Sequence, residues 1–122
     1  YILMKKRIVV VEPDLDIREI VGHILSDRGF EVIPYENEKG MFENIVFIMP
    51  DIILLDIFSV TEAGTELCRR LKEDPKTRDI PVIVLSTHTR AEIVKEICAE
   101  DVIPKPFDID HLILVVEEHV CS

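Results

Sequence analysis

Four polar residues with complementary chemistry stand at the ends of apolar stretches of the sequence. Asp56 ends one apolar run, and Glu12 directly follows another. Ser86 ends a third run, and Lys105 follows a fourth, shorter one. Carboxylate oxygens suit Mg²⁺, and an ammonium group can balance the charge of a phosphate. If one fold brings these four residues together, the sequence predicts a site for a phosphoryl group and a cation.

Apolar runs and amphipathic segments alternate along the chain. Short, continuous apolar runs predict strands that are covered on both faces, and apolar residues at helical spacing predict helices between them. For the first helix, Asp16 and Glu19 are placed as a capping box and Gly29 as the stop. The expected strands are 8–11, 30–35, 51–56, 81–86 and 102–103, and the expected helices are 17–25, 37–45, 64–73, 90–99 and one from 108.

Strands that alternate with helices predict an α/β fold, a doubly wound five-stranded parallel sheet with five helices on its two faces. In such a sheet, ligands bind at the carboxyl ends of the strands, near the point where strand order reverses. That edge is where the four polar residues would meet. The expected domain is 7–120, between an N-terminal extension at 1–6 and a tail at 121–122. Residues 1–3 precede Met4, so they are interpreted as lying ahead of the native start.

The composition disfavours several classes of function. A formal net charge of -10 is repelled by nucleic acid and by anionic membranes. No apolar run approaches the roughly 20 residues of a membrane span, and no signal peptide is evident. Three cysteines lack the spacing of metal or redox motifs, so they are expected to be small apolar residues in a reducing cytoplasm. They are Cys68, Cys98 and Cys121.

The order of these motifs resembles the receiver domain of two-component response regulators. The resemblance covers 7–120 and includes the Asp-Pro-Lys-Thr-Arg-Asp-Ile-Pro stretch at 74–81. It implies a flavodoxin-like strand order 2-1-3-4-5. It also implies a signalling domain rather than an enzyme, with an output domain, a partner protein or a second copy as downstream contact. The residues that carry it are Glu12-Pro13-Asp14, Asp56, Gly64, Ser86 and Lys105-Pro106-Phe107.

The resemblance also implies the roles of the phosphoryl-binding residues. Asp56 would accept a phosphoryl group from a phosphohistidine on a sensor histidine kinase or phosphotransfer protein. Lys105 would balance the phosphoryl charge, because the transition state spreads negative charge over the equatorial oxygens. Ser86 would offer a hydroxyl and Thr87 a backbone N–H. The bond between Lys105 and Pro106 is expected to be cis, as in the family.

The predicted magnesium site departs from the family pattern at one position. Glu12, Asp56 and the backbone carbonyl of Phe58 match the family's ligands, but Pro13 stands where a second acid normally contacts the metal. Two interpretations follow. Asp14 could act as a substitute ligand in a site with weakened magnesium affinity. Alternatively, the chain could be a pseudo-receiver that binds partner proteins without phosphorylation.

Each residue also has a purely structural interpretation. Asp56 could cap a turn, Lys105 could be a solvated loop residue, and Glu12 and Asp14 could serve only the first helix. Other functions on related sheets fit less well. An aspartyl phosphatase would need a second acid where Phe58 stands, and the glycine fingerprint of a dinucleotide enzyme is absent.

Overall fold

A single parallel sheet of five strands forms the centre of the computed structural model, which describes residues 5–57, 63–86 and 98–120. The strand order is β2-β1-β3-β4-β5, as predicted. The strands are β1 Arg7–Val11, β2 Glu31–Tyr35, β3 Ile52–Asp56, β4 Val82–Ser86 and β5 Asp101–Pro104. The helices are α1 Leu15–Asp27, α2 Met41–Ile48, α3 Ala63–Glu73 and α5 Ile109–Val120.

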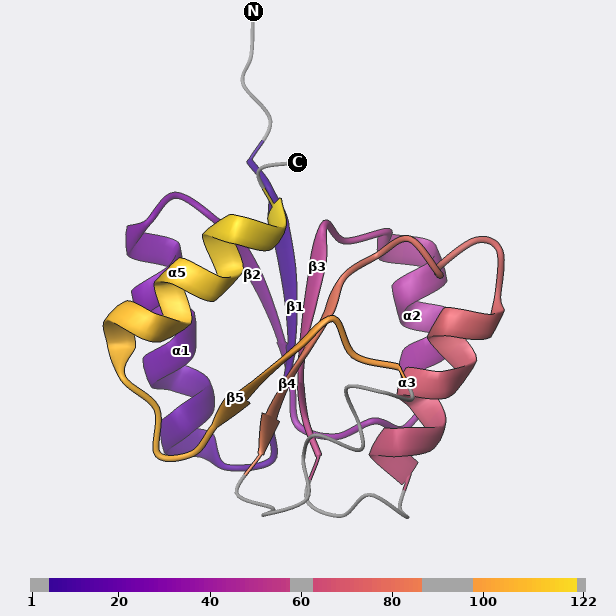
Figure 1. The fold of residues 1–122 in the computed structure, drawn as a ribbon, viewed down its shortest axis with the longest axis horizontal. Coiled ribbons are helices and arrows are strands. Elements are labelled where there is room, and N and C mark those ends of the chain that lie inside the picture. The colour runs from indigo at the N-terminus through magenta and orange to yellow at the C-terminus, as the bar shows by residue number, and fades with distance from the viewer. Residues whose placement is uncertain (1–4, 58–62, 87–97, 121–122) are drawn as a thin grey trace, which may run out of the picture.

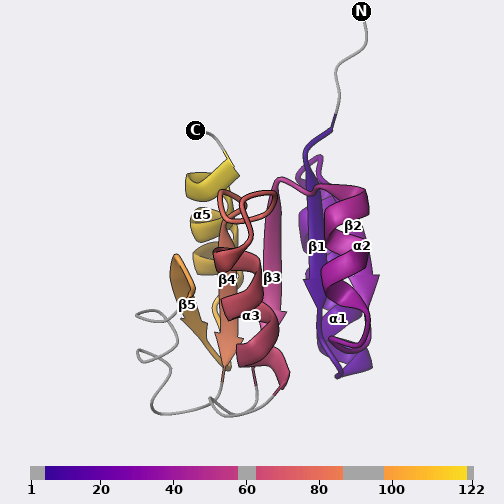
Figure 2. The ribbon, with the colours of Figure 1, turned by 90° about the vertical axis from the view of Figure 1, so that its right-hand side faces the viewer.

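Helices cover both faces of the sheet. In Figure 1, α1 and α5 lie on one side and α2 and α3 on the other. Figure 2, turned by 90°, shows the strands running in the same direction, with their carboxyl ends at the lower edge. This arrangement confirms the doubly wound α/β fold.

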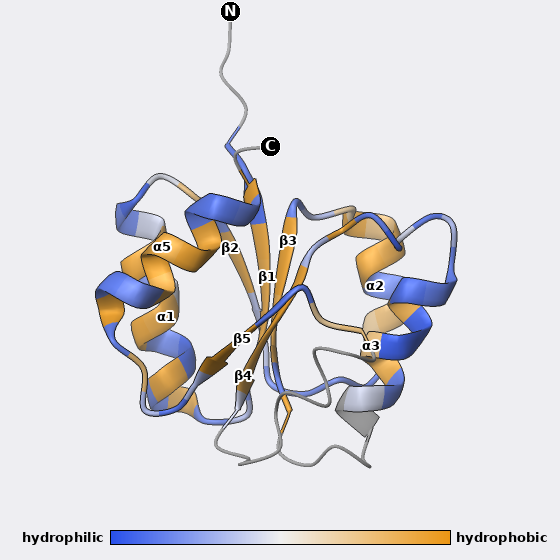
Figure 3. Cartoon of the chain, in the orientation of Figure 1, coloured by the Kyte–Doolittle hydropathy of each residue, from blue (hydrophilic) through white to orange (hydrophobic). Residues whose placement is uncertain are grey.

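Successive residues of the inner strands point to opposite faces, so each strand contributes to two cores. In β1, Val9 packs in the core under α2 and α3, and Val10 packs in the core under α1 and α5. In β3, Ile53 lies in the core under α2 and α3, and Leu54 lies in the core under α1 and α5. All four side chains are fully buried. Burial on both faces explains why these strands are apolar without interruption, as the hydropathy colours in Figure 3 show.

The start of α1 corrects the predicted capping box. The N-cap is Asp14, whose Oδ1 accepts a hydrogen bond from the backbone N–H of Ile17 at 3.1 Å. Asp16 and Glu19 therefore lie inside the helix rather than at its cap. A capping carboxylate satisfies one of the N–H groups that have no partner within the helix, which is why the helix begins two residues early. Gly29 ends the helix with a φ of 92°, as predicted.

The second helix lies further along the chain than predicted, at Met41–Ile48 instead of 37–45. The side chain of Asn37 accepts a hydrogen bond from the N–H of Lys39 at 3.0 Å, which favours a turn there. Gly40 follows with a φ of 67°, a left-handed conformation that cannot lie within a helix. This turn and the left-handed Gly40 prevent helix formation over the first residues of the predicted segment.

The predicted helix at 90–99 falls outside the described residues, except for its last two. Of these, Cys98 forms a disulfide with Cys68 of α3, and the two Cα atoms are 5.7 Å apart. The prediction that these cysteines are simply small apolar residues was therefore wrong. Their separation of 30 residues carries no motif, and only the packing of α3 against the chain just before β5 brings them within bonding distance.

Candidate functional site

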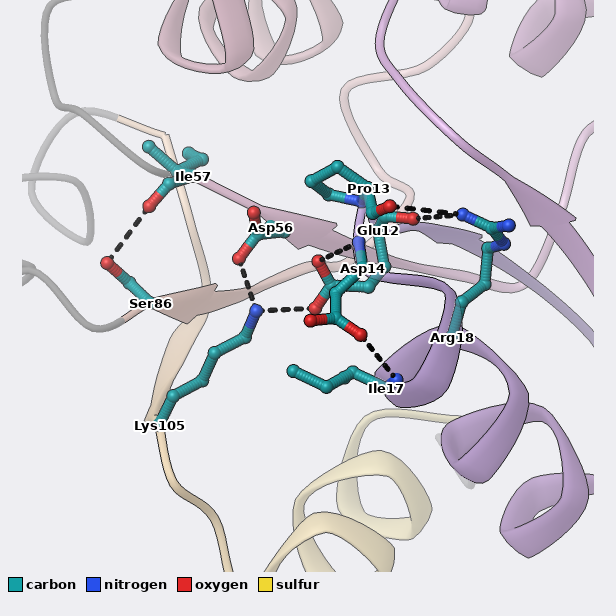
Figure 4. Close-up of polar contacts among 9 residues, drawn as sticks. All are labelled: Glu12, Pro13, Asp14, Ile17, Arg18, Asp56, Ile57, Ser86 and Lys105. Atoms are coloured by element: carbon teal, nitrogen blue, oxygen red, sulfur yellow. Dashed lines mark hydrogen bonds and ion pairs between the residues drawn. The ribbon is translucent and has the colours of Figure 1, made fainter.

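The parallel register brings the predicted residues to one edge of the sheet. Because Val11 pairs with Leu55, Glu12 and Asp56 follow at adjacent positions on neighbouring strands. On the other side of β3, the N–H of Ile57 donates to Leu85, one residue before Ser86. The pairing continues to β5, and Figure 4 shows the resulting cluster.

Lys105 enters this cluster from the end of β5. Its backbone N–H donates to the carbonyl of Ser86 at 2.9 Å, which extends the β4–β5 pairing past the end of the strand. The following Lys105-Pro106 peptide bond is cis, as predicted. The side chain then runs back across the strand ends toward the two carboxylates (Figure 4).

One ammonium group joins both carboxylates. Nζ of Lys105 lies 2.7 Å from Oδ1 of Asp56, and it also donates to Oε1 of Glu12. The side chain of Lys105 is 11% exposed, that of Asp56 is 9% exposed and that of Glu12 is 1% exposed. These groups would be separately hydrated in a solvated turn or loop. The purely structural interpretations of Asp56 and Lys105 therefore do not describe this geometry.

The charges in this cluster are unequal, with two carboxylates facing one ammonium. Burial raises the pKa of Glu12, the negative charge of Asp56 raises it further, and the hydrogen bond from Lys105 only partly offsets this. For Lys105, burial acts to lower the pKa, but the hydrogen bonds to Asp56 and Glu12 outweigh it, and the net pKa is raised. The cluster therefore favours the binding of a further positive charge.

The hydroxyl of Ser86 is buried beside the cluster. Its Oγ lies 3.0 Å from the backbone carbonyl of Ile57, to which it donates a hydrogen bond. That contact links the end of β4 to the residue that directly follows Asp56. Two further predicted site residues, Thr87 and Phe58, lie outside the described residues.

Asp14, the predicted substitute ligand, lies at the start of α1 beside Glu12. Its carboxylate caps α1, and its backbone N–H donates to Oε2 of Glu12 at 3.4 Å. Within 5–57, 63–86 and 98–120, no three acidic, histidine or cysteine side chains form a group that could hold a metal ion. The structure thus brings Glu12 and Asp56 together but leaves Asp14 out of the pair. Two carboxylates that already share one ammonium still fit Mg²⁺, which typically uses one or two carboxylates together with phosphate oxygens.

Arg18 contributes to the site, although the sequence did not single it out. Its Nη1 donates to the backbone carbonyl of Glu12 at 2.8 Å and contacts that of Pro13 at 3.5 Å (Figure 4). An arginine near the start of an amphipathic helix is typical of a solvated surface charge. Only the path of the preceding loop shows that its guanidinium reaches back to the site.

Comparison with known proteins identifies the family. The family model for the response regulator receiver domain matches residues 8–117. The phosphate regulon transcriptional regulatory protein PhoB of Pseudomonas aeruginosa is 36% identical over 114 residues, which cover 91% of this chain and 50% of that protein. The chain thus spans about half the length of the curated relatives it matches. It belongs to the response regulator receiver domain family.

Solved structures show the same fold. The receiver domain of a signal transduction histidine kinase from Syntrophus aciditrophicus is 29% identical, with a TM-score of 0.84 over 95% of this chain and 90% of that one. The receiver domain of the sensor histidine kinase PA1611 from Pseudomonas aeruginosa has a TM-score of 0.85 at 18% identity. The match covers 98% of this chain and all of the PA1611 receiver domain. The PA1611 structure holds a magnesium ion in its active site cleft. Receiver domains are signalling domains, and response regulators work with histidine kinases and output domains.

Proposed function

We propose that this receiver domain accepts a phosphoryl group on Asp56 and thereby switches its binding to a partner. The observation that carries the proposal is the contact of a single ammonium, that of Lys105, with both Asp56 and Glu12 at the carboxyl edge of the sheet. A nearly buried carboxylate beside a cation is poised to bear a group that adds negative charge. Family membership supports the same function.

The transfer would form one bond and break another. An oxygen of Asp56 would attack the phosphorus of a phosphohistidine while the P–N bond breaks. The electron pair would leave with the imidazole nitrogen, which takes up a proton. Negative charge spreads over the equatorial phosphoryl oxygens in the transition state. Lys105, already 2.7 Å from Asp56, would stabilise that charge, and Ser86 would donate to a phosphoryl oxygen after releasing the carbonyl of Ile57.

Glu12 and Asp56 would hold a magnesium ion, with the carbonyl of Phe58 as a third ligand. When bound, the ion supplies positive charge beside the phosphoryl oxygens. The excess of carboxylate over ammonium in the cluster supports this assignment. Pro13 has no side-chain ligand, and one oxygen of the Asp14 carboxylate is already used by the helix cap. We therefore infer that magnesium binding is weak.

The partners proposed for this chain follow from its family. A sensor histidine kinase or phosphotransfer protein would supply the phosphoryl group. An output domain, a separate partner protein or a second copy of the chain would respond to it. The net charge of -10 argues against direct contact of this domain with DNA. Within the described residues, no helix has the length and apolar character needed to cross a bilayer. We propose a cytoplasmic location, where histidine kinase partners would reach it.

Intact-mass measurement after incubation with a small phosphodonor tests the proposed function. With millimolar magnesium, the chain is expected to gain the mass of one phosphoryl group, and a metal chelator should slow the gain strongly. The adduct should be lost at alkaline pH, because an acyl phosphate is labile there. If no adduct forms at any magnesium concentration, the pocket does not accept a phosphoryl group. The proposed function would then be rejected in favour of the pseudo-receiver that binds partner proteins without phosphorylation.

Restoring the missing acid should strengthen the magnesium site. Pro13→Asp adds one carboxylate beside Glu12, and one charge-assisted contact is worth about 1.5–3 kcal/mol. The dissociation constant for magnesium is therefore expected to fall by about tenfold or more. Titration of magnesium against chemical shifts of the residues around Asp56 would measure it, and labelling by a phosphodonor should become faster at low magnesium.

Two control variants separate the possible causes. Pro13→Ala removes the proline ring without adding a ligand, so it should leave the magnesium affinity near that of the parent. Asp14→Asn keeps a good N-cap residue but removes the negative charge. If Asp14→Asn abolishes magnesium binding and Pro13→Asp has no effect, Asp14 is the third ligand and our assignment is incorrect.

A further inference from the structure

The backbone of Glu12 is held from both sides. Its N–H donates to the carbonyl of Tyr35 at the end of β2, at 3.0 Å. Its carbonyl accepts from the guanidinium of Arg18 at 2.8 Å. The first bond continues the pairing of β1 with β2, but the second comes from a side chain on the next helix. Glu12 is therefore fixed by a contact that the sheet does not provide.

The side chain of Glu12 depends on that backbone position. With only 1% of the side chain exposed, it reaches Lys105 through Oε1 and the N–H of Asp14 through Oε2. The distance to Asp14 is 3.4 Å, so this second contact is weak. A small rotation of the loop would move the carboxylate away from Lys105.

The guanidinium of Arg18 forms its hydrogen bonds with backbone carbonyls. Within the described part of the chain, its polar contacts are with the carbonyls of Glu12 and Pro13, and no carboxylate pairs with it. A guanidinium usually forms its strongest contacts with carboxylates or phosphates. Its use here on two successive carbonyls, at the position where the loop departs from the family pattern, indicates that it holds the loop in place.

We propose that Arg18 is a positioning residue, which orients Glu12 toward Lys105 by clamping the carbonyls of Glu12 and Pro13. The inference rests on the proposed phosphoacceptor function and names the residue that sets the geometry of one carboxylate in that site. The role requires no contact of Arg18 with the phosphoryl group or the metal ion, because its guanidinium bonds to the backbone of Glu12 and Pro13. Arg18 acts through the loop, so its loss should disturb the site more than the fold.

The test compares Arg18→Met with Arg28→Met. Arg28 lies at the opposite end of α1, and its ion pair with Glu117 is at the surface, so its replacement removes the same charge away from the site. Arg18→Met is expected to weaken magnesium binding and slow phosphodonor labelling, each by about tenfold, the equivalent of one lost charge-assisted hydrogen bond. Arg28→Met should change neither. Arg18→Lys, which keeps a donor and the charge, should recover part of the loss.

A measurement on the unphosphorylated protein makes the result independent of the proposed function. The ¹⁵N resonance of the Lys105 ammonium reports its pairing with Glu12, and it should shift in Arg18→Met but not in Arg28→Met. If wild type is never labelled but this shift occurs, the proposed function is wrong and the positioning role stands. If Arg18→Met lowers only the melting temperature and leaves magnesium affinity, labelling and the resonance unchanged, Arg18 has no positioning role. Equal losses in Arg18→Met and Arg18→Lys would also overturn it.

Discussion

Asp56→Asn is expected to abolish phosphoryl labelling of this protein completely. The substitution keeps the size and shape of the side chain but replaces an anionic nucleophile with a neutral amide, which does not attack phosphorus at a useful rate. Lys105 would still find an oxygen at this position, since the amide carbonyl can accept its hydrogen bond. The loss should therefore concern the chemistry and leave the fold intact. Intact-mass measurement after phosphodonor treatment would show it.

A matched variant at the other end of β3 controls for nonspecific effects. Asp51 precedes β3 at the opposite edge of the sheet, where its carboxylate accepts a hydrogen bond from the N–H of Arg7 at 2.8 Å. Asp51→Asn makes the same chemical change away from the site and should be labelled at the parental rate. Labelling that persists in Asp56→Asn would mean that another carboxylate is the acceptor, and the assignment of Asp56 would have to be abandoned.

Reduction of the disulfide between Cys68 and Cys98 is expected to lower the free energy of unfolding by about 3–4 kcal/mol. The cross-link closes a loop of 30 residues, and in the chain-entropy account closure of such a loop restricts the unfolded chain by about that amount. The midpoint of thermal unfolding should fall by roughly 10–20 °C for a domain of this size. Unfolding in urea with and without a strong thiol reductant would measure the difference directly.

The third cysteine provides the control for this measurement. Cys121→Ser leaves the pair intact, so it should show the same loss on reduction as the parent. In the double variant Cys68→Ala and Cys98→Ala, the reductant should not change the free energy of unfolding. A cytosolic environment keeps most thiols reduced, so this disulfide would be transient there. If reduction changes the free energy of unfolding by less than about 1 kcal/mol, the cross-link does not stabilise the domain as we expect.

The strands followed from local patterns, whereas their order followed from the resemblance to receiver domains. A strand covered on both faces must be apolar at every position, and Ile52–Leu55 has this property, so the prediction needed no knowledge of the neighbours. The ends of helices were less predictable. Asp14 and Asp16 are both good capping residues, and the choice between them depends on the exact path of the loop after β1.

The candidate site likewise has a part that the sequence predicted and a part that it did not. Asp56, Ser86 and Lys105 were predicted because each marks the end of a strand, and parallel strands must end at a common edge. The part that sequence reasoning missed involves contacts that cross between elements without a periodic signal. Arg18 reaches back over the first turn of its helix to the carbonyl of Glu12, and nothing in its neighbouring residues indicates this.

The sequence by itself thus determined the alternation of strands and helices, the parallel sheet and the edge where its polar residues gather, because burial and periodicity act on neighbouring residues along the chain. Only the tertiary structure decided that Cys68 bonds to Cys98, that Asp14 caps a helix, and that Lys105 bridges the carboxylates of Glu12 and Asp56. Each of these outcomes depends on distances of a few ångströms between segments that are brought together by packing, and separation along the chain does not specify such distances.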